Sequence, residues 1–281
     1  MKVAVIGGGT MGNGIVHVFA QYGHDVTLID LDRGALDRAL GTIARNLDRQ
    51  VKKGALADAD KDATLKRICA ATDLGAAAGA DLAIEAVFES FEVKKAIFER
   101  LDAVLGPEAI LASNTSSISI TKLAACTGRP GRVIGMHFMN PVPVMKLVEV
   151  ISGQATDPAV LARIMAVSTE LEKTPVAVQD YPGFISNRVL MPMINEAVQC
   201  LMEGVADRDA IDTVMKLGMA HPMGPLQLAD FIGLDVCLDI MNVLYDGFKD
   251  GKYRPSPLLV RMVAAGHLGR KTGRGFYDYQ A

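Results

Sequence analysis

Residues 1–12, M-K-V-A-V-I-G-G-G-T-M-G, decide the fold of this chain. A short apolar run, residues 3–6, leads directly into three glycines, and Gly12 completes the spacing G-x-G-x-x-G. A helix-length stretch follows, and a second apolar run ends at Asp30. The glycine spacing alone would be a weak signal. Strand, glycine loop, helix and a strand that ends in an acid together predict a dinucleotide-binding unit.

Each glycine of the loop has its own task in such a unit. Gly7 permits the tight turn, Gly9 lets the backbone approach a pyrophosphate, and Gly12 allows the helix to pack closely on the strand. The phosphates would lie at the N-terminus of the helix, where free N–H groups favour anions, and Thr10 and Met11 are expected to contact the cofactor there. The alternative is a glycine-rich turn without a ligand.

Asp30 bears on which dinucleotide is bound. Its carboxylate can accept hydrogen bonds from the ribose hydroxyls and would repel a 2′-phosphate, so the sequence favours NAD over NADP. Arg33, three residues later, keeps NADP open.

The first two thirds of the chain alternate between apolar runs and helix-length stretches. The expected strands cover residues 3–6, 26–29, 82–87, 110–112, 133–136, 147–151 and 176–178, and the expected helices include residues 12–22, 33–53, 91–105 and 118–125. Runs that are apolar throughout are typical of strands buried on both faces of a parallel sheet. The pattern predicts an α/β fold: a doubly wound Rossmann-type, mostly parallel sheet domain.

The pattern changes at Asp180-Tyr181-Pro182-Gly183, where Pro-Gly punctuation ends the last strand. Everything after it reads as helix, over residues 184–202, 207–217, 226–245 and 257–265. We therefore expect a Rossmann-type domain at residues 1–182 and an all-α domain at residues 183–281. The helix at 184–202 is apolar on more than one side, which fits either a core helix or a subunit interface.

Composition excludes several classes of protein. A net charge of −3 gives no reason to expect nucleic acid or an anionic membrane as partner. The four cysteines are scattered and form no C-x-x-C, so we expect no metal site and a reducing, cytoplasmic location. No signal peptide and no membrane-spanning apolar run is apparent.

Three polar features fall in or after expected strands. The run Ser113-Asn114-Thr115-Ser116-Ser117 follows one strand, His137 follows another, and Glu149 lies inside an apolar strand. Ligands collect at the carboxyl ends of parallel strands, which places the serines and His137 beside the cofactor. A carboxylate at Glu149 would need a partner, and pairing with His137 would orient the ring and favour its protonated form. This is how a base for an alcohol proton is built.

Each of these residues also has a structural explanation. His137 could simply be packed, Glu149 could face solvent, and Ser116 or Ser117 could cap the helix expected at 118–125. Their convergence beside a dinucleotide loop favours catalysis. Because no zinc-ligand spacing is apparent, the oxidation would rest on a side-chain base.

At this point the sequence resembles the L-3-hydroxyacyl-CoA dehydrogenase family, most of all its short bacterial 3-hydroxybutyryl-CoA dehydrogenases. The stretches that carry the resemblance run nearly end to end: G-G-G-T-M-G-N-G-I at 7–15, L-A-S-N-T-S-S-I-S-I at 111–120, G-M-H-F-M-N-P-V-P-V-M-K-L-V-E at 135–149, P-G-F-I-S-N-R at 182–188, H-P-M-G-P-L at 221–226 and G-R-K-T-G-R-G-F-Y-D-Y at 269–279. Together they are highly specific.

The resemblance implies a role for each matching residue. His137 is similar to the family's catalytic base and Glu149 to the acid that orients it, while Ser116 and Asn187 resemble the groups that hold the reacting substrate oxygen. Asn140 would lie near nicotinamide and substrate. Residues expected to contact the cofactor are Glu89, Lys94 and Lys271, and those expected to meet the CoA phosphates are Lys52 and Lys53. Met139 departs from the phenylalanine that is common in relatives, which we expect to alter packing only.

The resemblance implies an NAD-dependent oxidoreductase that oxidises (S)-3-hydroxyacyl-CoA, with 3-hydroxybutyryl-CoA as the expected short-chain substrate, and that catalyses the reverse reduction. It also implies a homodimer through the helical domain and a setting in fatty-acid or butanoate metabolism. Two other functions stay open: a binding or structural protein without turnover, and a dehydrogenase of a free hydroxy acid or sugar acid.

Overall fold

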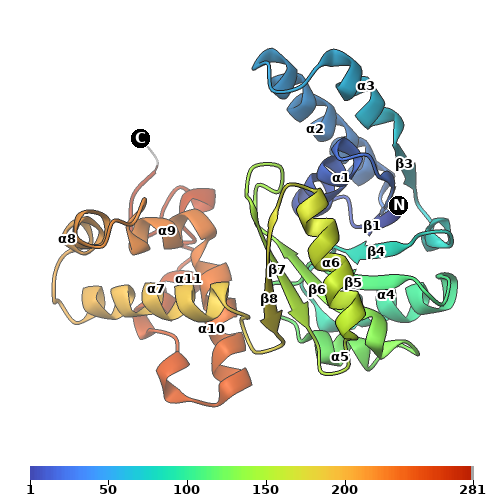
Figure 1. The fold of residues 1–281 in the computed structure, drawn as a ribbon. Coiled ribbons are helices and arrows are strands. Elements are labelled where there is room, and N and C mark those ends of the chain that lie inside the picture. The colour runs from blue at the N-terminus through green and yellow to red at the C-terminus, as the bar shows by residue number, and fades with distance from the viewer. Residues whose placement is uncertain (280–281) are drawn as a thin grey trace. The chain divides into compact units, whose positions relative to one another are not determined.

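The computed structural model describes residues 1–279, so the last two residues of the expected second domain, 280 and 281, lie outside it. The chain divides into two compact units, Met1–Asp180 and Tyr181–Ala281. Each unit has its own hydrophobic core, and Figure 1 shows the sheet and helices of the first unit and the helices of the second.

The first unit is built on one eight-stranded sheet with the order β3-β2-β1-β4-β5-β6-β7-β8. The strands are β1 (Lys2–Ile6), β2 (Asp25–Ile29), β3 (Ile68–Ala71), β4 (Leu82–Glu85), β5 (Ile110–Ser113), β6 (Val133–Phe138), β7 (Leu147–Ser152) and β8 (Thr174–Gln179). Every neighbouring pair is parallel except β6 and β7, which run antiparallel. The order reverses its direction of growth between β1 and β4, and in open sheets of this kind ligands bind at that switch point.

Helices cover the sheet of this unit (Figure 1). They are α1 (Thr10–Gln21), α2 (Arg33–Lys52), α3 (Asp58–Lys66), α4 (Phe91–Val104), α5 (Ile120–Ala124) and α6 (Pro158–Glu170), with short 3-10 turns η1 (Leu74–Ala77) and η2 (Pro130–Arg132). In α2 the buried residues Leu36, Ala39, Ile43 and Leu47 recur at helical spacing and join the core beneath β1 and β2. Asp32 caps this helix by accepting a hydrogen bond from the backbone N–H of Gly34.

The structure removes one alternative explanation of the serines. Ser116 and Ser117 do not cap the helix after β5, because α5 begins at Ile120 and Ser119 accepts a hydrogen bond from the backbone N–H of Lys122. Asp180 supports the same helix end from far along the chain, with Oδ2 accepting from the N–H of Thr121 at 2.7 Å. Ser116 and Ser117 are thereby left in the loop that precedes the helix.

The second unit is helical. Its elements are α7 (Ser186–Met202), α8 (Arg208–Thr213), the π-helical turn η3 (Val214–Gly218), α9 (Pro225–Ile232), α10 (Leu234–Phe248), η4 (Gly251–Tyr253), α11 (Pro257–Ala264) and η5 (Arg270–Thr272). The single helix expected over 226–245 is wrong: Gly233, with φ of +107°, ends α9 and starts α10. Among residues 1–279 no helix has both the length and the hydropathy to cross a bilayer.

Candidate active site

The turn between β1 and α1 is built on close backbone contacts at two glycines. Gly7 has φ of +109°, and a Cβ there would lie 2.6 Å from the carbonyl oxygen of Ala86. A Cβ on Gly12 would lie 1.8 Å from the carbonyl oxygen of Gly7. A Cβ on Gly9, by contrast, would meet no heavy atom within 4 Å. The fold therefore requires glycine at 7 and 12, whereas Gly9 keeps open space in which a ligand's phosphates can approach the backbone.

A cavity of about 610 Å³ opens beside this turn. Its lining includes the predicted cofactor residues Gly7, Gly9, Thr10, Met11 and Asp30. The Asp30 carboxylate is held in place, with Oδ2 accepting from the N–H of Gly8 at 2.7 Å and Oδ1 from the N–H of Asp32 at 2.9 Å. Two apolar residues of the lining, Leu31 and Phe88, are 81% and 80% exposed. A fixed carboxylate beside uncovered apolar side chains fits a nucleoside, with its ribose on the acid and its base on the apolar surface.

Arg33, the residue that left NADP open, lies near Asp37 at the surface of α2. Arg33 Nε lies 3.6 Å from Asp37 Oδ1, and Arg38 Nη2 lies 3.0 Å from Asp32 Oδ2. In the described lining of the cavity the basic residue is Arg100, not Arg33. The fixed carboxylate of Asp30 itself favours an uncharged 2′-hydroxyl over a 2′-phosphate, because like charges repel.

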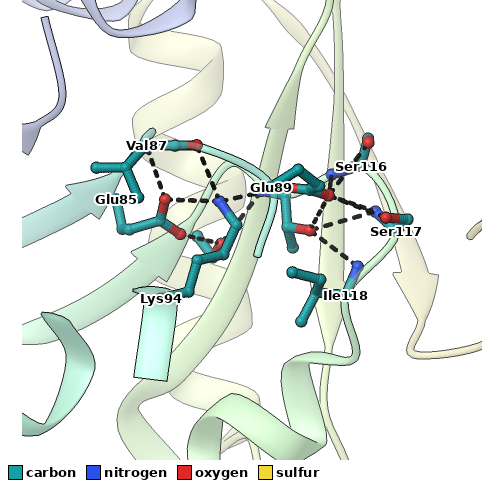
Figure 2. Close-up of polar contacts among 9 residues, drawn as sticks. Glu85, Val87, Glu89, Lys94, Ser116, Ser117 and Ile118 are labelled. Atoms are coloured by element: carbon teal, nitrogen blue, oxygen red, sulfur yellow. Dashed lines mark hydrogen bonds and ion pairs between the residues drawn. The ribbon is translucent and has the colours of Figure 1, made fainter. Parts of the chain in front are cut away.

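The run Ser113-Asn114-Thr115-Ser116-Ser117 is here called the serine loop. Its last three residues bind one carboxylate oxygen of Glu89, and Figure 2 shows this for Ser116 and Ser117. Glu89 Oε1 accepts a hydrogen bond from the Thr115 hydroxyl at 2.5 Å and from the backbone N–H groups of Ser116 at 2.9 Å and Ser117 at 3.1 Å. The Ser116 and Ser117 hydroxyls also donate to it, at 3.3 Å and 3.0 Å. Glu89, a predicted cofactor contact, thus fixes the backbone of Ser116, the predicted substrate contact.

Lys94 connects this acid to a second one. Its ammonium lies 3.2 Å from Glu89 Oε2 and 2.6 Å from Glu85 Oε1. Burial works against ionisation of Glu89, but the Lys94 charge and the Thr115 hydrogen bond hold the pKa of Glu89 below its usual range. Sequence reasoning missed Glu85. Its only signal was an acid inside the apolar run expected at 82–87, the kind of signal that singled out Glu149.

His137 and Glu149 lie opposite each other on the antiparallel pair β6 and β7, and their register is direct. His137 Nδ1 is 2.9 Å from Glu149 Oε2, and the residues are 8% and 2% exposed. A carboxylate on Nδ1 fixes the tautomer and orientation of the ring, so a proton exchanged with a substrate would be carried on Nε2. The arrangement suits a general base whose charged form is stabilised by the neighbouring acid.

Two further side chains hold the loops around His137. The sequence analysis gave Asn114 no role of its own within the polar run and missed Lys173. Asn114 Oδ1 accepts a hydrogen bond from the N–H of Phe138 at 2.9 Å and so ties the serine loop to β6. The buried Lys173 ammonium donates to the carbonyl oxygens of Val142 at 2.6 Å and Met145 at 2.8 Å. Those carbonyls belong to the β6–β7 connection, which also carries the exposed Asn140. Burial lowers the pKa of Lys173, and the charge of Lys146 adds to this.

The remaining predicted residues lie outside these clusters. Lys52 ends α2 and Lys53 is its exposed C-cap. Asn187 lies in the first turn of α7, and Lys271 lies in η5, where its ammonium is 2.6 Å from Asp235 Oδ2. Asn187 and Lys271 belong to the second unit, Tyr181–Ala281.

Two family models match the chain in sequence order. Residues 2–181 match the 3-hydroxyacyl-CoA dehydrogenase NAD-binding domain, and residues 183–279 match the 3-hydroxyacyl-CoA dehydrogenase C-terminal domain. The chain belongs to the 3-hydroxyacyl-CoA dehydrogenase family.

Individual proteins that are similar to this chain agree with the family match. A probable 3-hydroxybutyryl-CoA dehydrogenase of Deinococcus radiodurans is 56% identical over 279 residues, which cover 99% of this chain and 100% of the relative. A 3-hydroxybutyryl-CoA dehydrogenase of Bradyrhizobium diazoefficiens is 57% identical over 99% of this chain and 95% of its own length. The crystal structure of (S)-3-hydroxybutyryl-CoA dehydrogenase from Ralstonia eutropha superposes with a TM-score of 0.98 at 50% identity and covers 100% of this chain and 99% of that one.

These findings confirm the expected family, the expected fold class and NAD as the cofactor. The loop, cavity and acid described above fit that cofactor. When bound, NAD supplies the acceptor for a hydride, and the protein supplies orientation and proton transfer.

Proposed function

We propose that this chain oxidises (S)-3-hydroxyacyl-CoA to 3-oxoacyl-CoA with NAD and catalyses the reverse reduction, with 3-hydroxybutyryl-CoA as its short-chain substrate. The observation that supports this most directly is the buried His137–Glu149 pair, 2.9 Å apart, which joins the adjacent strands β6 and β7. The relatives named 3-hydroxybutyryl-CoA dehydrogenase supply the substrate class.

In the proposed mechanism neutral His137 takes the proton of the substrate's 3-hydroxyl on Nε2. Glu149, held on Nδ1, stabilises the imidazolium that forms. Ser116 and Asn187 position the substrate oxygen and hold carbon 3 toward the nicotinamide, with Asn140 beside both ligands. For this step the Ser116 hydroxyl, which donates to Glu89 at 3.3 Å in the structure, turns its proton to the substrate oxygen. In reduction, imidazolium His137 gives the proton back to the ketone. Reduction consumes a proton, so lower pH favours it at equilibrium.

We assign the ligand contacts as follows. Gly7, Gly9, Thr10, Met11 and Gly12 would form the pyrophosphate turn, and Asp30 would accept from the adenosine ribose. Glu89, Lys94 and Lys271 complete the proposed cofactor contacts. Lys52 and Lys53, cations at the exposed end of α2, would meet the CoA phosphates, where positive charge on flexible stems suits an anion in solvent.

We also propose a homodimer formed through the helical domain at residues 183–281, and a cytoplasmic location. Large apolar side chains on this unit support the dimer: Ile185, Val189, Val205, Val214, Leu217 and Met219 are each at least 50% exposed. Four cysteines without disulfide partners suit a reducing compartment.

The experiment follows the loss of NADH absorbance with purified protein and acetoacetyl-CoA, repeated with NADPH and with free acetoacetate. Rapid oxidation of NADH with the CoA ester, and little with the free acid or with NADPH, supports the reaction class, the need for CoA and the role of Asp30. Turnover of free acetoacetate would favour a hydroxy-acid dehydrogenase. A protein that binds NADH without turning over any substrate would contradict the proposal.

A further inference from the structure

We infer that Glu85 is a positioning residue for this reaction, which holds in place both the wall of the cofactor cavity and the serine loop. The inference rests on the proposed function. Glu85 ends β4, the strand between β1 and β5, and is 0% exposed. A carboxylate at such a place is costly unless donors surround it. Three do: the N–H of Val87 at 2.7 Å, the Ser113 hydroxyl at 2.7 Å and the Lys94 ammonium at 2.6 Å.

One arm of this cluster reaches the serine loop directly. The Ser113 hydroxyl donates to Glu85 Oε2 and accepts a hydrogen bond from the backbone N–H of Thr115 at 3.1 Å. Because a hydroxyl has a single proton, its donation to Glu85 leaves its lone pairs directed at the Thr115 N–H. Glu85 therefore orients the beginning of the serine loop through one intermediate group.

A second arm reaches the same loop through charge. Lys94 is 2.6 Å from Glu85 and 3.2 Å from Glu89, and Glu89 Oε1 accepts from the backbone N–H groups of Ser116 and Ser117. Side-chain exposure rises along this path, from 0% at Glu85 and 1% at Lys94 to 36% at Glu89. The buried pair thus fixes the place from which Glu89 holds the serine backbone (Figure 2).

The third arm reaches the cofactor cavity. Val87 donates its N–H to Glu85 and accepts a hydrogen bond from Lys94 on its carbonyl oxygen at 3.3 Å. Val87 and its neighbours Ala86 and Phe88 line the cavity beside the glycine turn. One carboxylate, itself 0% exposed, therefore connects the wall of the cofactor cavity to the proposed substrate contact Ser116.

A Glu85–Lys94 ion pair that served only stability would behave differently on mutation. Lys94 already has Glu89 as a counter-ion, so neutralising a buried lysine does not require Glu85. If Glu85 served stability alone, its loss would lower the melting temperature. Any change in kcat would then be the same with and without the Ser116 hydroxyl. If it positions the serine loop, much of its effect on turnover passes through the Ser116 hydroxyl.

The test is a double-mutant cycle on the full-length chain, with Glu85→Gln, Ser116→Ala and both together, assayed with NADH and acetoacetyl-CoA. Glu85→Gln keeps the size of the side chain and removes the ion pair with Lys94. We expect it to lower kcat by at least about tenfold in the wild-type background, as small misplacements of reacting groups do. In the Ser116→Ala background we expect a loss of less than about twofold, which is the mark of a shared path. The KM for NADH should rise as well, because the Val87 wall is disturbed.

One control and one replacement variant accompany this cycle. Asp102→Asn removes another carboxylate–cation pair of the same unit, 2.6 Å from Arg129 Nε, and should lower the melting temperature but leave kcat unchanged in both backgrounds. If Glu85→Gln does not fold, Ser113→Ala cuts the direct arm without removing a charge, and it should show a smaller loss with the same dependence on Ser116.

Equal losses from Glu85→Gln, or from Ser113→Ala in its place, in the two backgrounds would overturn the inference and leave the proposed function standing. A wild-type chain that binds NADH but does not reduce acetoacetyl-CoA would instead remove the proposed function, and the role of Glu85 with it.

Discussion

At the scale of single residues, the proposed chemistry depends on one carboxylate behind one imidazole. Glu149 faces His137 because the two strands are antiparallel and in direct register, and both side chains are nearly covered. The pairing could be predicted from sequence, since an acid in an apolar strand needs a partner and a histidine stood nearby. Glu85 gives the same signal in a strand of the same kind, but its partners Lys94 and Ser113 come from an adjacent helix and an adjacent strand. That three-way meeting depends on tertiary structure.

Glu149→Gln tests the orienting role. The amide keeps the shape but cannot offer a full negative charge to the imidazolium, so kcat should fall on the order of 10²-fold, in the range that general acid–base groups contribute. Steady-state rates with acetoacetyl-CoA and NADH measure this, and the melting temperature reports folding. A kcat within about twofold of wild type would mean that another group orients His137.

His17 gives a prediction about pH and stability. It is 0% exposed, its Nδ1 has no hydrogen-bond partner among the described residues, and burial lowers its pKa although a Gln21 hydrogen bond opposes the shift. Because the folded pKa lies below the unfolded one, the unfolded chain takes up the proton first as pH falls. Stability is therefore complete above the unfolded pKa of about 6.5 and is lost below it.

Urea unfolding of wild type and His17→Gln at about pH 7.5 and about pH 5.5 checks this. Wild type should lose more stability between the two conditions, by up to about 1.4 kcal/mol per pH unit for one proton. His24, whose pKa burial also lowers, is present in both proteins and cancels in the comparison. Identical pH dependence in the two proteins would show that His17 does not resist protonation.

At the scale of elements, the first strand–turn–helix unit was the most predictable part of the chain. Its glycine spacing, periodicity and terminal acid agree with one another, and the structure has β1, α1 and β2 where the sequence predicts them. The missed strand β3 has the sequence I-C-A-A, is only partly buried and lies at the sheet edge. Its edge pairing with β2 depends on a neighbouring strand and leaves little hydrophobic signal.

Two glycines of the turn should respond differently to alanine. Gly12→Ala places a Cβ 1.8 Å from the Gly7 carbonyl oxygen, so both the melting temperature and NADH affinity should fall. Gly9→Ala meets no atom within 4 Å in the chain, so the fold should persist while NADH affinity falls, because the Cβ occupies the space left for the phosphates. NADH titrations and thermal melts measure both, and Gly79→Ala, also without a neighbour within 4 Å, is the matched control. Undiminished NADH binding by Gly9→Ala would contradict the placement of the pyrophosphate.

At the scale of the whole molecule, two units with separate cores divide the proposed work. The first holds the glycine turn, Asp30, the serine loop and the His137–Glu149 pair, and the second holds Asn187 and Lys271. Sequence alone could place Asn187 in the site only through family resemblance, because nothing in the local pattern of α7 distinguishes a substrate contact from a helix residue. The same holds for Lys271, whose glycine-rich surroundings read equally well as a solvated tail.

The proposed homodimer can be checked on the intact chain. Light scattering should give about twice the monomer mass of 29.9 kDa. Leu217 is 82% exposed, and Leu217→Glu, which puts a charge on the apolar surface of the helical unit, should shift the mass toward the monomer at low protein concentration. Val144→Glu is the matched control, since Val144 is 70% exposed but lies in the first unit. A wild-type monomer at micromolar concentration would contradict the dimer.

The central claim is that His137 carries the proton in an NAD-dependent 3-hydroxyacyl-CoA dehydrogenase reaction, and one comparison tests it most directly. NADH oxidation by wild type and by His137→Ala is measured with saturating acetoacetyl-CoA, after NADH binding has been shown to be equal. We predict that wild type turns over rapidly and that His137→Ala loses at least about 10²-fold in kcat. An unchanged kcat in His137→Ala would contradict the claim and leave the buried histidine as a packing residue.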